Sequence, residues 1–367
     1  MHSQSFRALA VALALTCCAT VHAQSQPADS AVVFGRDVIN PRTGESSQAL
    51  FVTDRWGISL AQVTSPRDGV RDAEASWSPG GTHLVFARYG GSPGSQLLVV
   101  DRQGERVSRL TSGQRDDHNP VWGPGSLIVF ESAASDPEPD CLRVVDWQTR
   151  RQRELFCAVA EYNGARTDVQ SPMWSADGNS VYVAASPPAG RLGEAWYGDV
   201  YRVDVATGSA TRLAQTWLDE QSHGIIAPDG RTAVFHDEFS ESGLIRLDVA
   251  DGTRTSLGRG GTPVFSSDGR QLAFVRTITV GTWPDSLQLT QVFVADLDTG
   301  VQRQVTNHRD PTLRFSTLDW SAQGTHVLVQ HWNEGDLHRQ LAILDLATAE
   351  FWPLPQGEAS DEAWFDR

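Results

Sequence analysis

Two of the ten histidines in this sequence stand in unusually acidic segments. His118 lies within Asp116–Asn119, and His223 closes the segment Asp219–His223. An imidazole beside carboxylates can bind a cation, orient a polar ligand or change its charge near neutral pH. The sequence contains no His-Glu-x-x-His motif and no paired histidine spacing typical of zinc sites. Such chemistry therefore depends on a fold that brings distant segments together.

Both segments belong to a repeat. Phe265–Gly269 ends a short apolar run and Leu272–Val275 resumes it, which is typical of a tight hairpin. The same hairpin recurs about every 40 to 55 residues. Its aromatic or aliphatic position falls at Trp77, Trp122, Trp174, Ile226, Phe265 and Trp320. A second hairpin, an apolar run closed by an aspartate and a turn, is marked by Asp101, Asp146, Asp204, Asp248, Asp296 and Asp345.

A seventh copy is split between the two ends of the sequence. Leu50–Gly57 matches the second hairpin, and Asp361–Trp364 matches a first strand. Four-stranded repeats of this length predict an all-β fold, a seven-bladed β-propeller, with residues 24–367 as a single domain. We expect a split blade of three N-terminal strands plus one C-terminal strand to close the ring, because an open ring leaves two sheet edges exposed. The alternative is a sandwich or a stack of unrelated hairpins.

The position three residues before the aromatic is polar in every copy of the repeat. We predict that these side chains form a polar ring at the mouth of the channel, with an acidic shell behind it. The candidate binding residues are Asp72, Glu74, His118, Asn119, Asp168, Glu220, His223, Asp319 and Asp361. Carboxylates gathered at a narrow mouth favour a divalent cation, a polar cationic ligand or a basic protein segment. The alternative is a solvated rim satisfied by water and arginine pairs.

The long connections of the repeat gather on one face of the predicted ring, here called the loop-rich face. The opposite face, here called the turn face, carries only tight turns. We expect loops at Gly35–Gln48, Ser132–Asp140, Ser186–Asp199, Thr277–Thr290 and Gln330–Arg339. Binding residues tend to lie where loops are held by a rigid scaffold. We therefore place the function on the loop-rich face, which also receives the polar ring.

The repeat resembles a known family. Trp77–Gly81 and its copies, followed by the Asp-x-x-Thr-Gly of Asp296–Gly300, resemble the WD-like repeat of TolB-type β-propeller proteins. The repeats of prolyl oligopeptidase propellers and oligogalacturonate lyases are similar. The resemblance covers Ala31–Arg367 and implies the fold, whereas unrelated activities share the repeat. TolB itself has six blades and an α/β domain ahead of them. We count seven blades and expect no such domain.

We expect a protein- or ligand-binding scaffold rather than an enzyme. The alternative is a metal-assisted polysaccharide lyase or hydrolase with its site at the channel mouth, as the resemblance to oligogalacturonate lyases implies. Gly90–Gly94 matches the Gly-x-Ser-x-Gly nucleophile motif, but it lies between two strands, and Pro93 lacks the N–H that an oxyanion hole needs. The sequence has no lysine, which excludes a Schiff-base mechanism. We therefore predict no catalytic residue and no cofactor, although a divalent cation is compatible with the ring.

Residues 1–23 read as a cleaved signal peptide. Arg7 precedes the apolar stretch Ala8–Thr20, and Val21–Ala23 is a small-residue cleavage site. The apolar stretch is too short to span a bilayer. We expect a periplasmic or secreted protein without a membrane span; a lipoprotein is the weaker alternative. The net charge of −15 argues against nucleic acid as a partner, and we expect a monomer.

Two cysteines outside this segment predict a disulfide. Cys141 and Cys157 flank the hairpin that turns at Asp146–Arg150, which places them opposite each other or one step apart. In an oxidising compartment such a pair should form a bridge. The alternative is two buried free thiols.

Overall fold

The computed structural model describes residues 31–54, 56–134, 138–159, 166–186, 197–217, 224–237, 243–282, 284–336, 339–354 and 359–365. Their regular structure consists of strands, and these ranges contain no helix. Accordingly, no helix long and apolar enough to cross a membrane occurs among them. The all-β prediction is confirmed for this part of the chain.

The first sheet has eight strands and contains both ends of the described chain. Its order is β29-β1-β2-β4-β5-β6-β7, with β3 paired to β2. The strands are β29 (Ala359–Phe365), β1 (Ala31–Ile39), β2 (Ser46–Asp54), β3 (Leu60–Gln62), β4 (Arg71–Trp77), β5 (His83–Tyr89), β6 (Gln96–Asp101) and β7 (Val107–Arg109). β29 runs antiparallel to β1, with Val33 opposite Trp364. β2 and β4 share a single parallel pair, Gln48 with Arg71.

Five further sheets follow in chain order, and each is antiparallel. The second and third contain β8 (Asp116–Trp122), β9 (Leu127–Ala133), β10 (Cys141–Asp146) and β11 (Gln152–Phe156), then β12 (Ala158–Val159), β13 (Arg166–Trp174), β14 (Ser180–Ser186), β15 (Tyr197–Asp204) and β16 (Ala210–Trp217). The fourth contains β17 (Gly224–Ile226), β18 (Thr232–Asp237), β19 (Gly243–Asp248) and β20 (Arg254–Gly258). The last two contain β21 (Gly261–Phe265), β22 (Gln271–Val280), β23 (Leu287–Asp296) and β24 (Gln302–Gln304), then β25 (Leu313–Trp320), β26 (His326–Asn333), β27 (Gln340–Asp345) and β28 (Phe351–Pro353).

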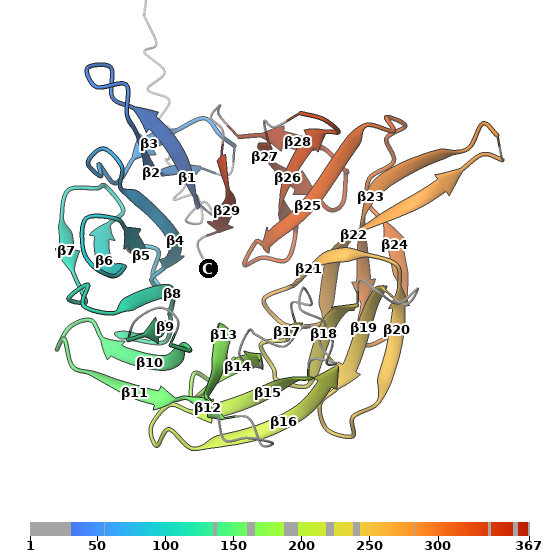
Figure 1. The fold of residues 1–367 in the computed structure, drawn as a ribbon. Helices are drawn as coiled ribbons and strands as arrows, with labels where there is room; N and C mark the ends of the chain where they lie inside the picture. The colour runs from blue at the N-terminus through green and yellow to red at the C-terminus, as the bar shows by residue number, and fades with distance from the viewer. Residues whose placement is uncertain are drawn as a thin grey trace, which may run out of the picture.

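The sheets lie side by side around a common centre, with β4, β8, β13 and β21 on the inner side (Figure 1). The core lies between neighbouring sheets, so the middle strands contain runs of consecutive buried apolar residues rather than apolar residues at alternate positions. Leu84–Ala87 of β5, for example, are completely buried. The first and last sheets also pack together, since Val32 and Phe34 share a cluster with Leu328 and Ile343.

The tight hairpins of the repeat are present and explain its motif. Between β21 and β22, Gly269 has φ of 71° and its N–H donates to the carbonyl of Ser266. Asp268 Oδ1 accepts from the Ser266 hydroxyl at 2.7 Å and from the backbone N–H of Arg270 at 3.0 Å. The serine and aspartate therefore close the turn, and glycine supplies a backbone conformation that other residues rarely adopt.

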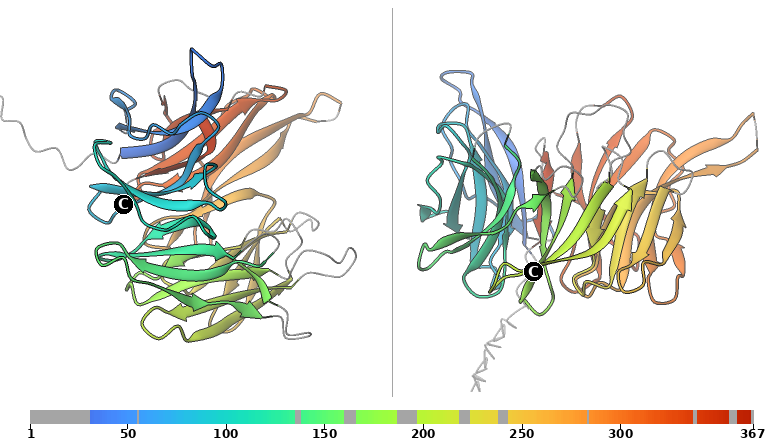
Figure 2. Two further views of the ribbon diagram at one scale, coloured as in Figure 1. Left: turned by 60° about the vertical axis from the view of Figure 1, so that its left-hand side comes forward. Right: turned by 60° about the horizontal axis from the view of Figure 1, so that its bottom comes forward.

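One expected loop is wrong. The spacing of the repeat predicts a loop at Thr277–Thr290, but most of this segment extends the β22–β23 hairpin, whose pairing continues to Val280 opposite Leu287. This hairpin projects well beyond the other sheets (Figure 2). The reason is local: Thr277–Val280 is a run of β-branched residues, which favour the extended backbone. Part of Gly35–Gln48 likewise belongs to the paired strands β1 and β2.

The predicted disulfide is confirmed. Cys141 and Cys157 are bonded, with Cα atoms 4.5 Å apart. The pairing of β10 with β11 puts Leu142 opposite Phe156, and a bulge then shifts the register by one residue. A bridge that closes a loop of 16 residues contributes about 3 kcal/mol in the chain-entropy model.

Candidate functional site

The polar position of the repeat coincides with a bulge in the innermost strand. Glu74, Asn119, Ser171 and Thr262 all have positive φ, between 45° and 53°. In β4, β8, β13 and β21 the register with the next strand shifts at this position. A non-glycine residue held in this conformation is strained, and the surrounding structure must compensate for it.

Hydrogen bonds between neighbouring sheets provide that compensation. Glu74 Oε2 accepts from the backbone N–H of Asn119 at 2.6 Å. Glu131 Oε1 accepts from the Asn119 side-chain amide at 2.6 Å and from the backbone N–H of Ser171 at 2.8 Å. Thr262 Oγ1 accepts from the backbone N–H of Thr317 at 3.1 Å. In each of these three cases a side chain of one sheet therefore accepts from the backbone N–H at the polar position of the next sheet, where an unpaired N–H would be costly.

His118, Glu131 and Asp140 form a compact cluster of titratable groups next to these hydrogen bonds. His118 Nε2 is 3.3 Å from Glu131 Oε2 and 3.6 Å from Asp140 Oδ2. His118 and Glu131 are cross-strand partners on β8 and β9. Asp140 immediately precedes β10. Because β8 begins where β9 ends and β10 begins, the cluster lies at the loop-rich end of the second sheet.

The loop that carries Asp140 is held from two sides. The backbone N–H of Asp140 donates to Asp168 Oδ1 at 3.0 Å, and the backbone carbonyl of Asp140 accepts from the N–H of Val169 at 3.2 Å. The next residue, Cys141, is joined to Cys157. Asp140 is therefore fixed between the second and third sheets rather than carried on a free loop.

The surroundings shift the pKa values of the cluster. Burial lowers the pKa of His118, but the hydrogen bond to Glu131 and the nearby carboxylates outweigh it and raise the value to about 9. Burial raises the pKa of Asp140 to about 6; the charge on His118 opposes this shift, and Glu131, Asp168 and Asp116 strengthen it. At neutral pH, therefore, His118 is an imidazolium between two carboxylates, and Asp140 ionises at a cost.

Because Asp140 loses free energy when it ionises in the folded protein, Asp140→Asn should stabilise the protein at neutral pH. An acid whose folded pKa lies above its unfolded value loses stability as pH rises from about 4 to 6, and the penalty remains above that range. We expect Asp140→Asn to raise the melting temperature in EDTA at pH 7.5 by a few degrees, about 1–2 kcal/mol, and to do nothing near pH 3.5. The control is Asp298→Asn, at a side chain 72% exposed, which should change little. A lower melting temperature for Asp140→Asn at pH 7.5 would contradict the assignment.

Other predicted site residues have different environments. Asp72 is completely buried and forms a two-point ion pair with Arg88. Asp319 is buried and accepts from the backbone N–H of Trp320 at 2.8 Å. Asp361 lies in β29, and only its backbone is described. Glu220 and His223 lie outside the described residues.

Two members of the cluster, Glu131 and Asp140, were not among the sequence candidates. Glu131 carries a weak sequence signal for a functional residue, since it is the only charge in the apolar strand Leu127–Ala133. In the structure its side chain is buried, with 4% exposure. A buried charge in an apolar strand needs a partner. Asp140 is marked only by its position before Cys141.

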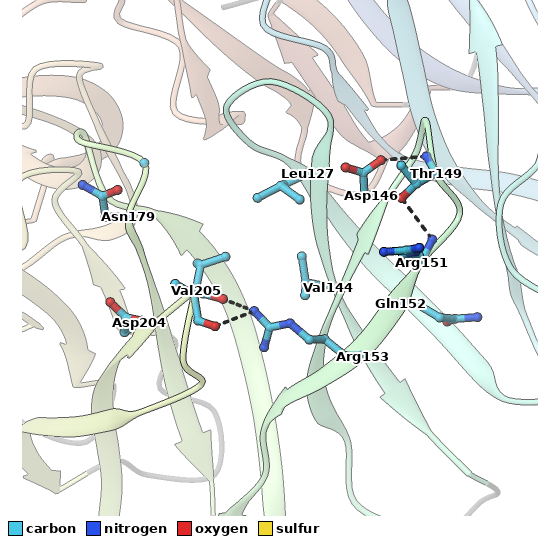
Figure 3. A pocket seen from close by; sticks show the side chains of 12 residues that line it. Leu127, Val144, Asp146, Thr149, Arg151, Gln152, Arg153, Asn179, Asp204 and Val205 are labelled. Carbon is cyan, nitrogen blue, oxygen red and sulfur yellow. Dashed lines mark hydrogen bonds between the residues drawn. The ribbon is translucent and has the colours of Figure 1, made fainter.

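A cavity of about 880 Å³ lies elsewhere, between the second and third sheets on the turn face (Figure 3). Arg153 crosses it and donates to the carbonyls of Val205 and Ala206. Its carboxylates are already engaged: Asp146 accepts from the N–H of Thr149 at 2.8 Å, and Asp204 accepts from the N–H of Thr207 at 2.8 Å. The sequence predicts only tight turns on this face and therefore no binding site there. The polar groups of this cavity that are named here are therefore already used to hold turns and to join sheets.

Comparison with known proteins identifies the fold. No family model matches the chain, and neither does any curated protein. An oligogalacturonate lyase in complex with manganese is 14% identical, with a TM-score of 0.61 over 87% of this chain and 83% of that one. Oligogalacturonate lyase from Vibrio parahaemolyticus is 13% identical, with a TM-score of 0.60 over 90% and 87%. TolB from Acinetobacter baumannii is 17% identical, with a TM-score of 0.49 over 91% and 82%. At such identities the likeness shows a β-propeller fold alone.

Proposed function

We propose that this protein is a periplasmic or secreted β-propeller that binds a cationic ligand, such as the basic segment of a partner protein, on its loop-rich face. The observation that carries this proposal is the convergence of carboxylates between the second and third sheets. Glu131 and Asp140 lie in one cluster with His118, and Asp168 accepts from the backbone N–H of Asp140. Asp140 Oδ1 is buried and has no hydrogen-bond partner, so it can accept a bond from an incoming cation.

The architecture supports a rigid binding face. We propose that the eight-stranded sheet is two four-stranded blades, β29-β1-β2-β3 and β4–β7, since their strand pairing is continuous through one parallel residue pair alone among the described strands, Gln48 with Arg71. With the five other sheets this makes seven blades, closed by β29 on β1. Loops on a closed ring change little in position, which lowers the entropic cost of binding.

The chemistry of the chain supports an extracytoplasmic location. Disulfides such as Cys141–Cys157 form and persist in oxidising compartments outside the cytoplasm. A net charge of −15 attracts basic partners over a distance of about 10 Å at 0.1 M salt. The leader predicted at residues 1–23 lies outside the described residues.

Site-specific photocrosslinking tests which face binds. A benzophenone amino acid is placed at Ala134 or Glu138, which are both exposed and lie in the chain between β9 and Asp140, and in matched variants at Asp251 or Asp298 on the turn face. We expect adducts in the cell envelope from the first pair alone. An octalysine peptide or 0.5 M salt should suppress them, because the attraction is electrostatic. Adducts from the turn face alone, or loop-rich adducts that octalysine does not reduce, would refute the proposal.

A further inference from the structure

The three side chains of the cluster are spaced like ligands of one metal ion. Ligand atoms about 2.0–2.2 Å from a metal lie about 3–3.5 Å from one another. His118 Nε2 lies 3.3 Å from a Glu131 oxygen and 3.6 Å from an Asp140 oxygen. One ligand atom from each side chain falls within 4.8 Å of the other two. Small rotamer adjustments would place all three around a common centre.

An unsatisfied atom points to a missing ligand at this place. Asp140 Oδ1 is buried and lacks a hydrogen-bond partner, although its other oxygen faces His118. Buried carboxylate oxygens without a partner are uncommon, because the lost hydration is not replaced. A cation bound between Asp140 and its neighbours would supply the missing interaction.

The cluster is also organised as metal sites are. Glu131 is held through Oε1 by Asn119 and Ser171, which leaves Oε2 directed at His118. Contacts of this kind orient ligating carboxylates and raise metal affinity. Asp140 is held through its backbone by Asp168 and Val169. His118 and Asp140 remain 25% and 20% exposed, so an ion can reach them from solvent.

From this geometry we propose that His118, Glu131 and Asp140 bind a first-row divalent transition-metal ion such as Zn²⁺ or Mn²⁺, which takes the place of the proton on His118 Nε2 and releases it to solvent. One imidazole with two carboxylates suits these ions better than Mg²⁺ or Ca²⁺, which prefer all-oxygen sites. Three protein ligands leave at least one coordination position for water or a ligand. The metal site shares Asp140 Oδ1 with the proposed binding face, so a metal ion and a basic segment would compete for that oxygen. Metal binding does not require a partner, however, and is measured without one, so either proposal can fail alone.

A second grouping, Cys141, Glu154 and Cys157, does not compete for this role. Its two sulfurs are joined in the disulfide and cannot act as thiolate ligands. Among the described residues, the cluster is therefore the metal-ligating group that remains.

Metal titration of the purified full-length protein, without an affinity tag and stripped with EDTA, tests the proposal. The probes are Zn²⁺, Mn²⁺ and Co²⁺, with Mg²⁺ and Ca²⁺ for comparison. By calorimetry we expect one Zn²⁺ or Mn²⁺ per chain. The absorption bands of bound Co²⁺ should show mixed nitrogen and oxygen ligation. Saturating metal should also raise the melting temperature, since it binds the folded state.

Single substitutions assign the ligands. Glu131→Gln and Asp140→Asn should each weaken Zn²⁺ or Mn²⁺ binding at least 100-fold. Asp140→Asn should remain folded, which separates loss of a ligand from loss of structure. The matched control is His326→Asn, because His326 lies 3.4 Å from Asp345 but belongs to no such cluster; it should bind metal normally. Absence of saturable binding below about 100 µM, or binding that both cluster variants retain, would overturn the proposal.

Discussion

A chain that ends at residue 358, and so lacks β29, should lose cooperative unfolding and most of its thermal stability. β29 pairs with β1 and also contacts β4, β25 and β26. Its removal exposes the edge of β1 and weakens the junction between the first and last sheets. In a ring of repeats each interface supports its neighbours. The loss should therefore approach the whole stability of a domain, about 5–15 kcal/mol.

Calorimetry and light scattering of the truncated protein check this expectation. A peptide of residues 358–367 added in excess should restore part of the melting transition, because it can pair with β1 again. Deletion of residues 366–367 alone is the control and should change little. If the chain that ends at 358 melts at the temperature of the full chain and stays monomeric, β29 does not close the ring.

The second large effect should come from Asp72→Ala, which should cost about 3–5 kcal/mol. Asp72 is completely buried, and its two oxygens accept from Arg88 Nε at 2.6 Å and Nη2 at 2.7 Å. The pair is cross-strand on β4 and β5. Loss of the carboxylate leaves the guanidinium, 21% exposed, without its counter-charge. Replacing both residues, as Asp72→Leu with Arg88→Met, should recover most of the loss.

Chemical denaturation of these variants measures the free energy of unfolding. The control is the pair Arg270 with Asp298, whose side chains are both 72% exposed and 3.9 Å apart. Asp298→Ala should cost less than about 1 kcal/mol, because water screens an exposed pair. A cost for Asp72→Ala as small as that of the control would show that the buried pair adds little.

The sequence by itself determined the features that depend on neighbouring residues. The hairpins followed from Asp268 and Gly269 and their copies, because these residue types close a tight turn through local hydrogen bonds. The disulfide followed from the same reasoning, since a hairpin's turn defines its register and brings Cys141 opposite Cys157. The residues that make these interactions are close together in the chain, so a local sequence pattern is enough to predict them.

The sequence determined the polar position of the repeat but not its conformation. The repeat located Glu74, Asn119, Ser171 and Thr262 as equivalent positions. Their positive φ could not be foreseen, because none of them is glycine and the strain is compensated from the neighbouring sheet. The expected loop at Thr277–Thr290 shows the reverse case, in which β-branched residues extended a hairpin that spacing alone assigned to a loop.

Only the tertiary structure decided which groups form the candidate site. Glu131 meets His118 because β8 and β9 pair in one particular register, and a shift of one residue would turn the two side chains to opposite faces. Asp140 joins them because the third sheet, through Asp168 and Val169, holds its loop in place. The site thus depends on register and on packing between sheets. No local pattern records such contacts, because the residues that make them lie on different strands and are brought together only by the completed fold.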